Sequence, residues 1–235
     1  MIFNVISNKF QLKFKDRESS GNILGEALKD IIKKDERKNT LVLGIPRGGV
    51  ITADIIARKL HCEFDIIIPR KLRAPSNEEL AIGAILGDGT TYLNEIIVKN
   101  LEISPKYIQD EKLHQLEEIK RRASLYCFGN REFTKSGNLN FDNKTVILVD
   151  DGAATGATVI VAVRWIRANT NPHRFILAIP IAPKYTVNLL KGENIDHIEV
   201  ITCPDLNFKS LEQYYNNFSQ VTDRQVIDII TSYKK

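Results

Sequence analysis

Cysteine is scarce in this sequence of 235 residues, and its three copies, Cys62, Cys127 and Cys203, lie far apart. No CxxC pair or Cys/His cluster is present, so nothing in the cysteine pattern indicates a metal site. A sparse, odd set of thiols is typical of a reducing cytosol, where buried cysteines pack as small apolar side chains.

Long apolar runs are also missing. The first residues, MIFNVISNKF, have neither the basic flank nor the long apolar run of a signal peptide. No stretch approaches the ~18 apolar residues that a membrane span requires. We therefore expect a cytoplasmic protein that does not contact a membrane.

A strong charge of one sign is absent as well. The chain has 33 basic and 29 acidic residues, a formal net charge of +4. This imbalance is too small to indicate nucleic acid, which we do not expect as a partner. The helix around Lys120, Arg121 and Arg122 is the only candidate for a basic face, and we interpret its charged run as a solvated surface. A basic site for a small polyanionic ligand fits the composition equally well.

Strand and helix patterns alternate along the chain. Short apolar runs predict buried strands over residues 41–45, 64–68, 145–149, 175–179 and 198–202. Helical spacing predicts helices over 17–34, 50–60, 157–168, 184–190 and 222–233, and a long charged helix that begins at Pro105. An edge strand is expected over 10–14, and a hairpin over 81–86 and 90–93.

Strands without polar alternation favour an α/β fold with a mostly parallel sheet flanked by helices. The hydrophobic content of 43% is ordinary for a globular protein with a sizeable core. We expect a single domain over 1–235, with a core of about 14–203 and a C-terminal hood and helix of about 204–235.

The most informative segment is residues 146–158, VILVDDGAATGAT. An apolar strand ends in two carboxylates, and a loop of small residues and hydroxyls then opens a helix. Ligands of open α/β sheets bind at the carboxyl ends of the strands. Small residues let backbone amides converge on an anion, the helix N-terminus adds its dipole, and threonines add hydroxyl donors. The predicted phosphate-binding residues are Gly152, Ala153, Ala154, Thr155, Gly156, Ala157 and Thr158.

Asp150 and Asp151 add a second requirement, because carboxylates repel phosphate. They make sense only if the ligand also presents hydroxyl donors or a cation. A ribose diol beside a phosphate, with magnesium nearby, meets both conditions. The rival phosphate loops, GxxxxGK[ST] and GxGxxG, are absent.

This segment resembles the signature of type I phosphoribosyltransferases. In that family the two acids contact the ribose hydroxyls of phosphoribosyl pyrophosphate, and the loop holds its 5′-phosphate. The resemblance implies a Rossmann-like parallel sheet with a small hood, and catalytic roles for Asp150 and Asp151. It also implies Mg²⁺ as cofactor, held by these two acids directly or through water or ribose. The implied partners are phosphoribosyl pyrophosphate and a nitrogenous acceptor, and because many relatives are dimers a homodimer is one expectation.

Two further segments extend the resemblance. Residues 44–49, GIPRGG, resemble the family's pyrophosphate-binding loop, which assigns Arg47, Gly48 and Gly49 to that role. Residues 69–79, PRKLRAPSNEE, resemble the flexible loop that closes over the reaction centre. Three cations within four residues there suit a leaving pyrophosphate, and we assign Arg70 and Lys71 to it.

The acceptor is the least explicit part of the sequence. In family members that act on 6-oxopurines, a carboxylate usually occupies the position of Ala154. The alanine therefore favours an adenine- or pyrimidine-like acceptor. A general base could come from the lid, where Glu79 is our candidate beside Glu78. The chain from Phe14 to Gln220 also resembles bacterial and archaeal phosphoribosyltransferase-domain proteins whose acceptor is generally unassigned.

Three functions remain open at this point. The leading hypothesis is a Mg²⁺-dependent transferase that joins a phosphoribosyl group to a nitrogenous base. The second is a non-catalytic sensor of phosphoribosyl pyrophosphate or nucleotides, which needs the phosphate loop and no general base. The third is a hydrolase that attacks a ribose phosphate with water.

Overall fold

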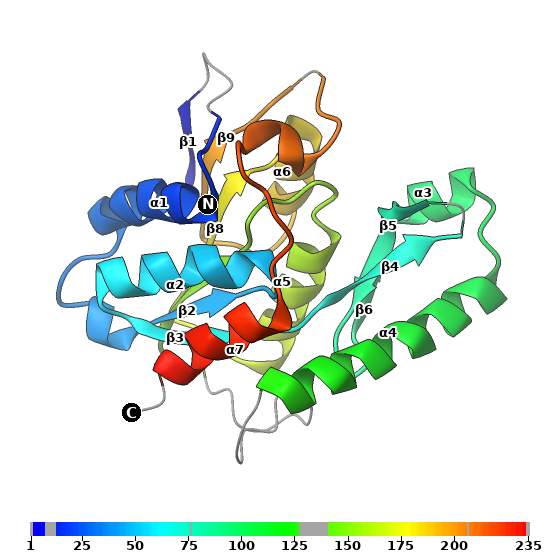
Figure 1. Cartoon of the computed structure of the whole chain (residues 1–235), viewed down its shortest axis with the longest axis horizontal. Helices are drawn as coiled ribbons and strands as arrows, with labels where there is room; N and C mark the ends of the chain where they lie inside the picture. Colours follow the sequence, from blue (N-terminus) through cyan, green and yellow to red (C-terminus); the bar gives the residue numbers. More distant parts are fainter. Residues whose placement is uncertain (1, 8–12, 76, 127–140, 206, 234–235) are drawn as a thin grey trace.

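A parallel sheet of six strands forms the centre of the molecule (Figure 1). The structure is a computed structural model and describes residues 2–7, 13–75, 77–126, 141–205 and 207–233. The strands lie in the order β1-β9-β8-β7-β2-β3, and each pairs with its neighbour in parallel. Their bounds are β1 Ile2–Ser7, β2 Thr40–Gly44, β3 Glu63–Ile66, β7 Thr145–Val149, β8 Arg174–Ile181 and β9 His197–Thr202.

Helices cover both faces of this sheet, as the unbroken apolar strands predict. Neighbouring residues of one strand belong to different cores: Val42 of β2 packs in one hydrophobic cluster, Leu41 and Leu43 in the other. Side chains of α1 (Arg17–Ile31), α2 (Gly48–Leu60) and α7 (Asp223–Ser232) join the first cluster. Those of α5 (Ala157–Asn169) and α6 (Lys184–Lys191) join the second. The α/β fold with a flanked parallel sheet is therefore confirmed.

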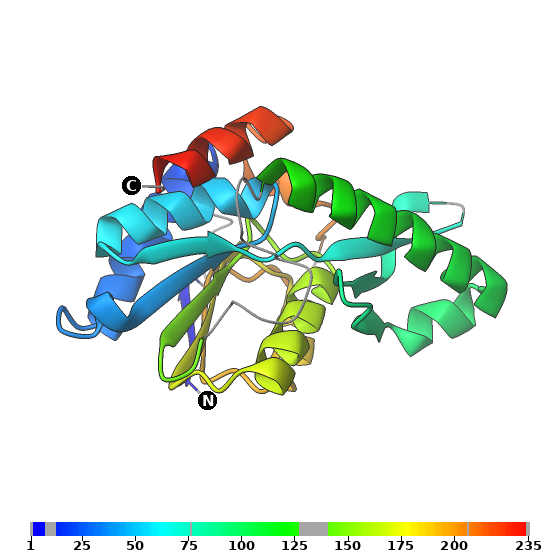
Figure 2. The same ribbon diagram turned by 90° about the horizontal axis from the view of Figure 1, so that it is seen from below.

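A second, smaller layer extends from the end of β3, and we call it the arm. It contains the antiparallel strands β4 (Arg70–Ala74), β5 (Asn77–Ile85) and β6 (Thr91–Leu93), followed by α3 (Glu95–Asn100) and α4 (Pro105–Tyr126). Figure 2 shows α4 running from the arm back to α7 on the main body, which it contacts. The arm thus reaches the core at both of its ends.

Several predictions need correction in this region. The predicted loop over residues 69–79 is wrong for most of its length, because β4 and the start of β5 occupy it. The interpretation of the charged helix as a solvated surface is also wrong in part, since Gln115 and Arg122 of α4 are buried. Neither α3 nor the edge strand β1 was predicted. Of the strand expected over 10–14, residues 10–12 lie outside the described ranges, and Phe14 forms only an isolated bridge with Tyr215.

The C-terminal segment returns to the core. Phe14 donates its backbone N–H to the carbonyl of Tyr214, the last residue of the short helix η2 (Leu211–Tyr214). Thr222 caps α7 with a reciprocal capping box, as its sequence position predicts. The boundary between a core of 14–203 and a hood of 204–235 stays a prediction. No helix among the described residues is both long and apolar enough to cross a membrane.

Candidate functional site

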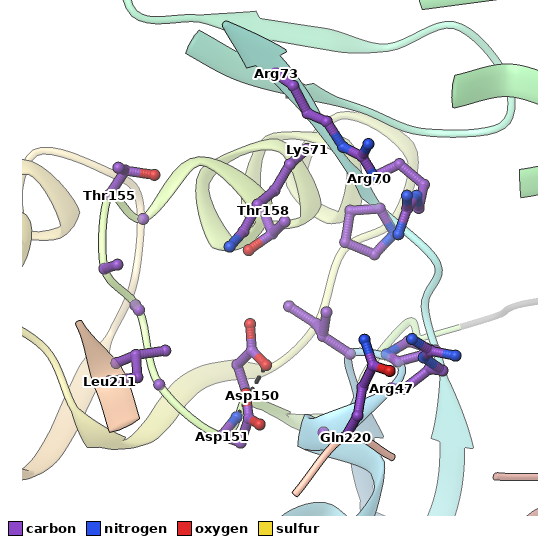
Figure 3. Close-up of a pocket in the computed structure, with 18 of the residues that line it drawn as sticks. Arg47, Arg70, Lys71, Arg73, Asp150, Asp151, Thr155, Thr158, Leu211 and Gln220 are labelled. Carbon is purple, nitrogen blue, oxygen red and sulfur yellow. Dashed lines mark hydrogen bonds between the residues drawn. The ribbon is translucent and has the colours of Figure 1, made fainter. Parts of the chain in front are cut away.

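A cavity of about 340 Å³ opens at the carboxyl ends of β2, β3 and β7, and we call it the first cavity (Figure 3). Its position agrees with the rule that open α/β sheets bind ligands at this edge. Three chain segments, far apart in sequence, and the C-terminal segment meet there. The lining residues are Ile45, Pro46, Arg47, Gly48, Pro69, Arg70, Lys71, Arg73, Glu78, Asp150, Asp151, Gly152, Ala153, Ala154, Thr155, Gly156, Thr158, Leu211 and Gln220.

One wall is the loop of residues 150–158, which we call the cradle. The N–H of Ala153 donates to the carbonyl of Ile181 at the end of β8, over 2.9 Å. The carbonyl of Ala154 accepts hydrogen bonds from the hydroxyls of Tyr185 and Thr186, both on α6. Gly156 adopts φ 76°, a left-handed conformation that favours glycine, and α5 begins at the next residue. The cradle is therefore held by its neighbours in one backbone conformation.

Asp150 is the most deeply placed acid of the site, with only 8% of its surface exposed. The N–H of Asp151 donates to its Oδ1 over 2.9 Å. Burial, and then the neighbouring charge of Asp151, raise the pKa of Asp150 well above its usual value, whereas Lys71 opposes that shift. A hydroxyl donor or cation placed here would stabilise the ionised carboxylate.

Asp151 is held by a residue that the sequence did not reveal. Its Oδ2 lies 2.6 Å from Nε of Arg17, on the first turn of α1, and both side chains are largely buried. The Arg17 guanidinium also donates to the carbonyl of Ser219 over 2.8 Å and stacks 3.9 Å above the Phe218 ring. The Tyr215 hydroxyl donates to the Asp151 carbonyl over 2.8 Å. Arg17 thus ties the cradle to the C-terminal segment.

The loop after β2 lies directly against the two acids. The peptide bond between Pro46 and Arg47 is cis. A Cβ added to Gly48 would overlap the Asp151 carboxylate, and one added to Gly49 would lie 2.8 Å from Cα of Asp150. Only glycine therefore lets the start of α2 approach the cradle this closely.

The other wall carries side-chain cations from the start of the arm. Arg70, Lys71 and Arg73 of β4 line the cavity, and Lys71 projects toward Thr158 (Figure 3). Arg47 joins them, with its Nη1 3.7 Å from Asp223 Oδ1. Burial, and then nearby guanidinium groups, lower the pKa of Arg70 to about 10, so it stays protonated at neutral pH. The cavity therefore has acids and amides on one side and cations on the other.

Most of the predicted site residues meet in this cavity, with three exceptions. Gly49 and Ala157 do not line it, although both flank residues that do. The side chain of Glu79 lies outside what the structure describes, and Glu78 on the same strand lines the cavity, bonded to Arg73 over 2.9 Å. Leu211 and Gln220 were missed, since no local pattern marks them. No group of three or more potential metal ligands is present among the described residues.

The chain belongs to the phosphoribosyl transferase domain family, which matches residues 11–214. Two proteins of Mycobacterium tuberculosis are 34% identical to it over 214 residues: "Putative phosphoribosyl transferase Rv0571c" (strain ATCC 25618 / H37Rv) and "Putative phosphoribosyl transferase MT0597" (strain CDC 1551 / Oshkosh). The match covers 91% of this chain, which spans less than half, 45%, of either relative.

A solved structure extends the similarity to three dimensions. The crystal structure of TT1426 from Thermus thermophilus shares 31% sequence identity with this chain, at a TM-score of 0.70. The alignment covers 94% of this chain and 99% of that one. The resemblance inferred from residues 146–158 is thus confirmed at the level of the family and its fold.

Proposed function

We propose that this chain transfers a phosphoribosyl group from phosphoribosyl pyrophosphate to a nitrogenous base. The observation that carries the proposal is the first cavity, where a buried pair of acids adjoins an amide-rich loop and faces four cations. A ligand that fits must present hydroxyls beside one phosphate and a second anionic group some distance away. Phosphoribosyl pyrophosphate has this arrangement of groups.

Each wall has a distinct role in the proposed reaction. The cradle amides, with Thr155 and Thr158, bind the 5′-phosphate at the N-terminus of α5. Asp150 and Asp151 accept hydrogen bonds from the ribose hydroxyls. The pyrophosphate lies toward the cationic wall, where Arg47, Arg70 and Lys71 stabilise the negative charge that builds up as the bond to C1 of the ribose breaks.

Magnesium fits this arrangement in a particular way. Mg²⁺ is commonly held by one or two carboxylates together with substrate phosphates, rather than by an all-protein cage. Asp150 is a buried carboxylate next to a second carboxylate, and a cation would stabilise its ionised form. Asp151 would act with it or through the ribose. The ion would neutralise charge on the leaving pyrophosphate.

The acceptor belongs, in our proposal, to the adenine- or pyrimidine-like class. Ala154 supplies no side chain to hydrogen-bond a 6-oxopurine, and its carbonyl is already engaged by α6. A general base would come from the start of β5, where Glu79 or its neighbour Glu78 is the candidate. Leu211 and Gln220, on the C-terminal side of the cavity, are placed to contact the acceptor.

The test is the release of pyrophosphate from phosphoribosyl pyrophosphate and Mg²⁺ across a panel of purine and pyrimidine bases. We expect one class of base to accelerate release, and Asp150→Asn to abolish the acceleration. Omission of Mg²⁺ is expected to have the same effect. Tight binding of phosphoribosyl pyrophosphate without turnover by any base would instead identify a sensor. Release at one rate with and without a base would identify a hydrolase.

A further inference from the structure

A second cavity, of about 500 Å³, adjoins the first on the side of the arm. Arg47, Arg70 and Arg73 line both cavities, so the two share one cationic wall. The remaining lining residues belong to α4 and have no role in the proposed reaction. They are His114, Glu117, Glu118, Arg121 and Arg122.

The second cavity carries an excess of positive charge. Five arginines line it against two glutamates, which leaves a net charge of +3 with His114 neutral. Glu118 already accepts hydrogen bonds from both Arg121 and Arg122, at 2.7 and 2.8 Å, and these lower its pKa to about 2. Asp223, at the start of α7, accepts from Arg121 over 3.1 Å. Asp223 also lies 3.7 Å from Arg47, and Glu78 accepts from Arg73 over 2.9 Å, so Arg70 is the one of the five cations without a carboxylate partner among the described residues.

Arg122 is buried and Arg70 is half-buried where they line the second cavity. The side chain of Arg122 is 6% exposed, and only its Nε has an acceptor among the described residues. Nε of Arg70 donates over 2.9 Å to the neutral amide of Gln115, which is fully buried. Among the described residues, no carboxylate pairs with Arg70. A partly desolvated guanidinium group without counter-charge, such as that of Arg70, is costly, and an anion would offset that cost.

We propose that the second cavity is a binding site for a phosphate-bearing anion, separate from the ligand of the first cavity. Guanidinium groups bind phosphate oxygens through paired N–H donors. The terminal nitrogens of Arg70 and Arg122 have no acceptor among the described residues and are available for this role. Because Arg47, Arg70 and Arg73 line both cavities, an anion in the second changes the charge that the first presents to its own ligand. The site is therefore also a place from which phosphate compounds regulate the first cavity.

Calorimetric titration with inorganic pyrophosphate tests the site, using the full chain and variants that touch only one cavity. Arg121→Gln removes a lining cation and should weaken binding at this site about tenfold. Glu117→Gln removes an exposed lining acid, does not threaten the fold, and should tighten binding severalfold. Lys120→Gln removes the same charge from α4 outside the cavity and should leave the affinity unchanged. Equal affinities for Arg121→Gln and Lys120→Gln, with no gain in Glu117→Gln, would overturn the proposal.

A variant of the first cavity distinguishes a separate site from an extension of the leaving-group site. Thr158 lines only the first of the two cavities. Thr158→Val should therefore not change the pyrophosphate-binding event that Arg121→Gln weakens. We expect the wild-type chain to bind two pyrophosphate molecules, and Arg121→Gln to weaken one of the two events about tenfold. A single event lost equally in both variants would show one continuous pyrophosphate site and overturn the separation. The assay measures binding alone, so failure of every base to accelerate turnover would leave it unaffected.

Discussion

The two walls of the first cavity present different chemical groups to a ligand. The cradle presents backbone amides and two buried acids, and hydrogen bonds to β8 and α6 hold it in place. The opposite wall presents long side chains from β4, in a three-stranded sheet that belongs to the arm. Backbone donors in a fixed loop recognise a ligand group of constant geometry, such as a phosphate on a ribose. Side-chain cations suit a group whose position changes during reaction, such as a leaving pyrophosphate.

The largest expected effect concerns Arg17, which holds the Asp151 carboxylate of the cradle. Arg17→Ala leaves the mostly buried Asp151 without its partner, and breaking a buried ion pair costs about 3 kcal/mol of unfolding free energy. Chemical denaturation followed by circular dichroism measures the loss. The matched control is Arg224→Ala, which removes an arginine that is 82% exposed and paired with Asp228. Its cost should stay below about 1 kcal/mol, and equal costs would contradict the contrast between the anchor and the surface.

A smaller effect is expected from two variants, one at each wall, which should weaken the binding of different ligands. Thr186→Val removes a fully buried hydroxyl that holds the Ala154 carbonyl, and Gln115→Leu removes the amide that holds Arg70. Thr186→Val should weaken ribose 5-phosphate about tenfold and pyrophosphate little, and Gln115→Leu should do the reverse. Calorimetry with each ligand tests both variants. The same loss of both ligands in both variants would show that the walls do not act independently.

The smallest effect concerns the acid that organises α4. Arg121 and Arg122 lower the pKa of Glu118 from 4.5 to about 2, so ionised Glu118 stabilises the fold. That contribution is present above pH 4.5 and is lost as the pH falls toward 2. Because the side chain is partly solvated, we expect about 1 kcal/mol or less. The melting temperatures of wild type and Glu118→Gln should differ at pH 7 and converge in acid, and a difference constant with pH would refute this.

The cradle was predictable from sequence because its determinants are contiguous. Within residues 146–158 a buried strand, two acids, small residues and a helix start follow one another, so local chemistry predicts a strand, a loop and a helix in this order. The alternation of buried strands with helices and the N-cap at Thr222 were predictable for the same reason. Each of these features depends on residues only a few positions apart.

The structure of the arm was harder to predict from sequence, because it depends on contacts between residues that are far apart in the chain. The charges of Arg70, Lys71 and Arg73 hide the strand β4, whose pairing with β5 shifts register on both sides of Arg73. Arg17 meets an acid 134 positions away, and no local pattern signals that contact. Gln115 likewise appears as one polar residue in a charged helix, although it is fully buried against Arg70.

The close approach at Gly48 has a mechanical consequence. With no room for a side chain between the start of α2 and the Asp151 carboxylate, the two loops touch without slack. A ligand that displaces Asp151 from Arg17 toward Gly48 would press on the first turn of α2, and Arg47 precedes that turn directly. Because Arg47 lines both cavities, we expect such a displacement to change the shape and the charge of the two cavities together.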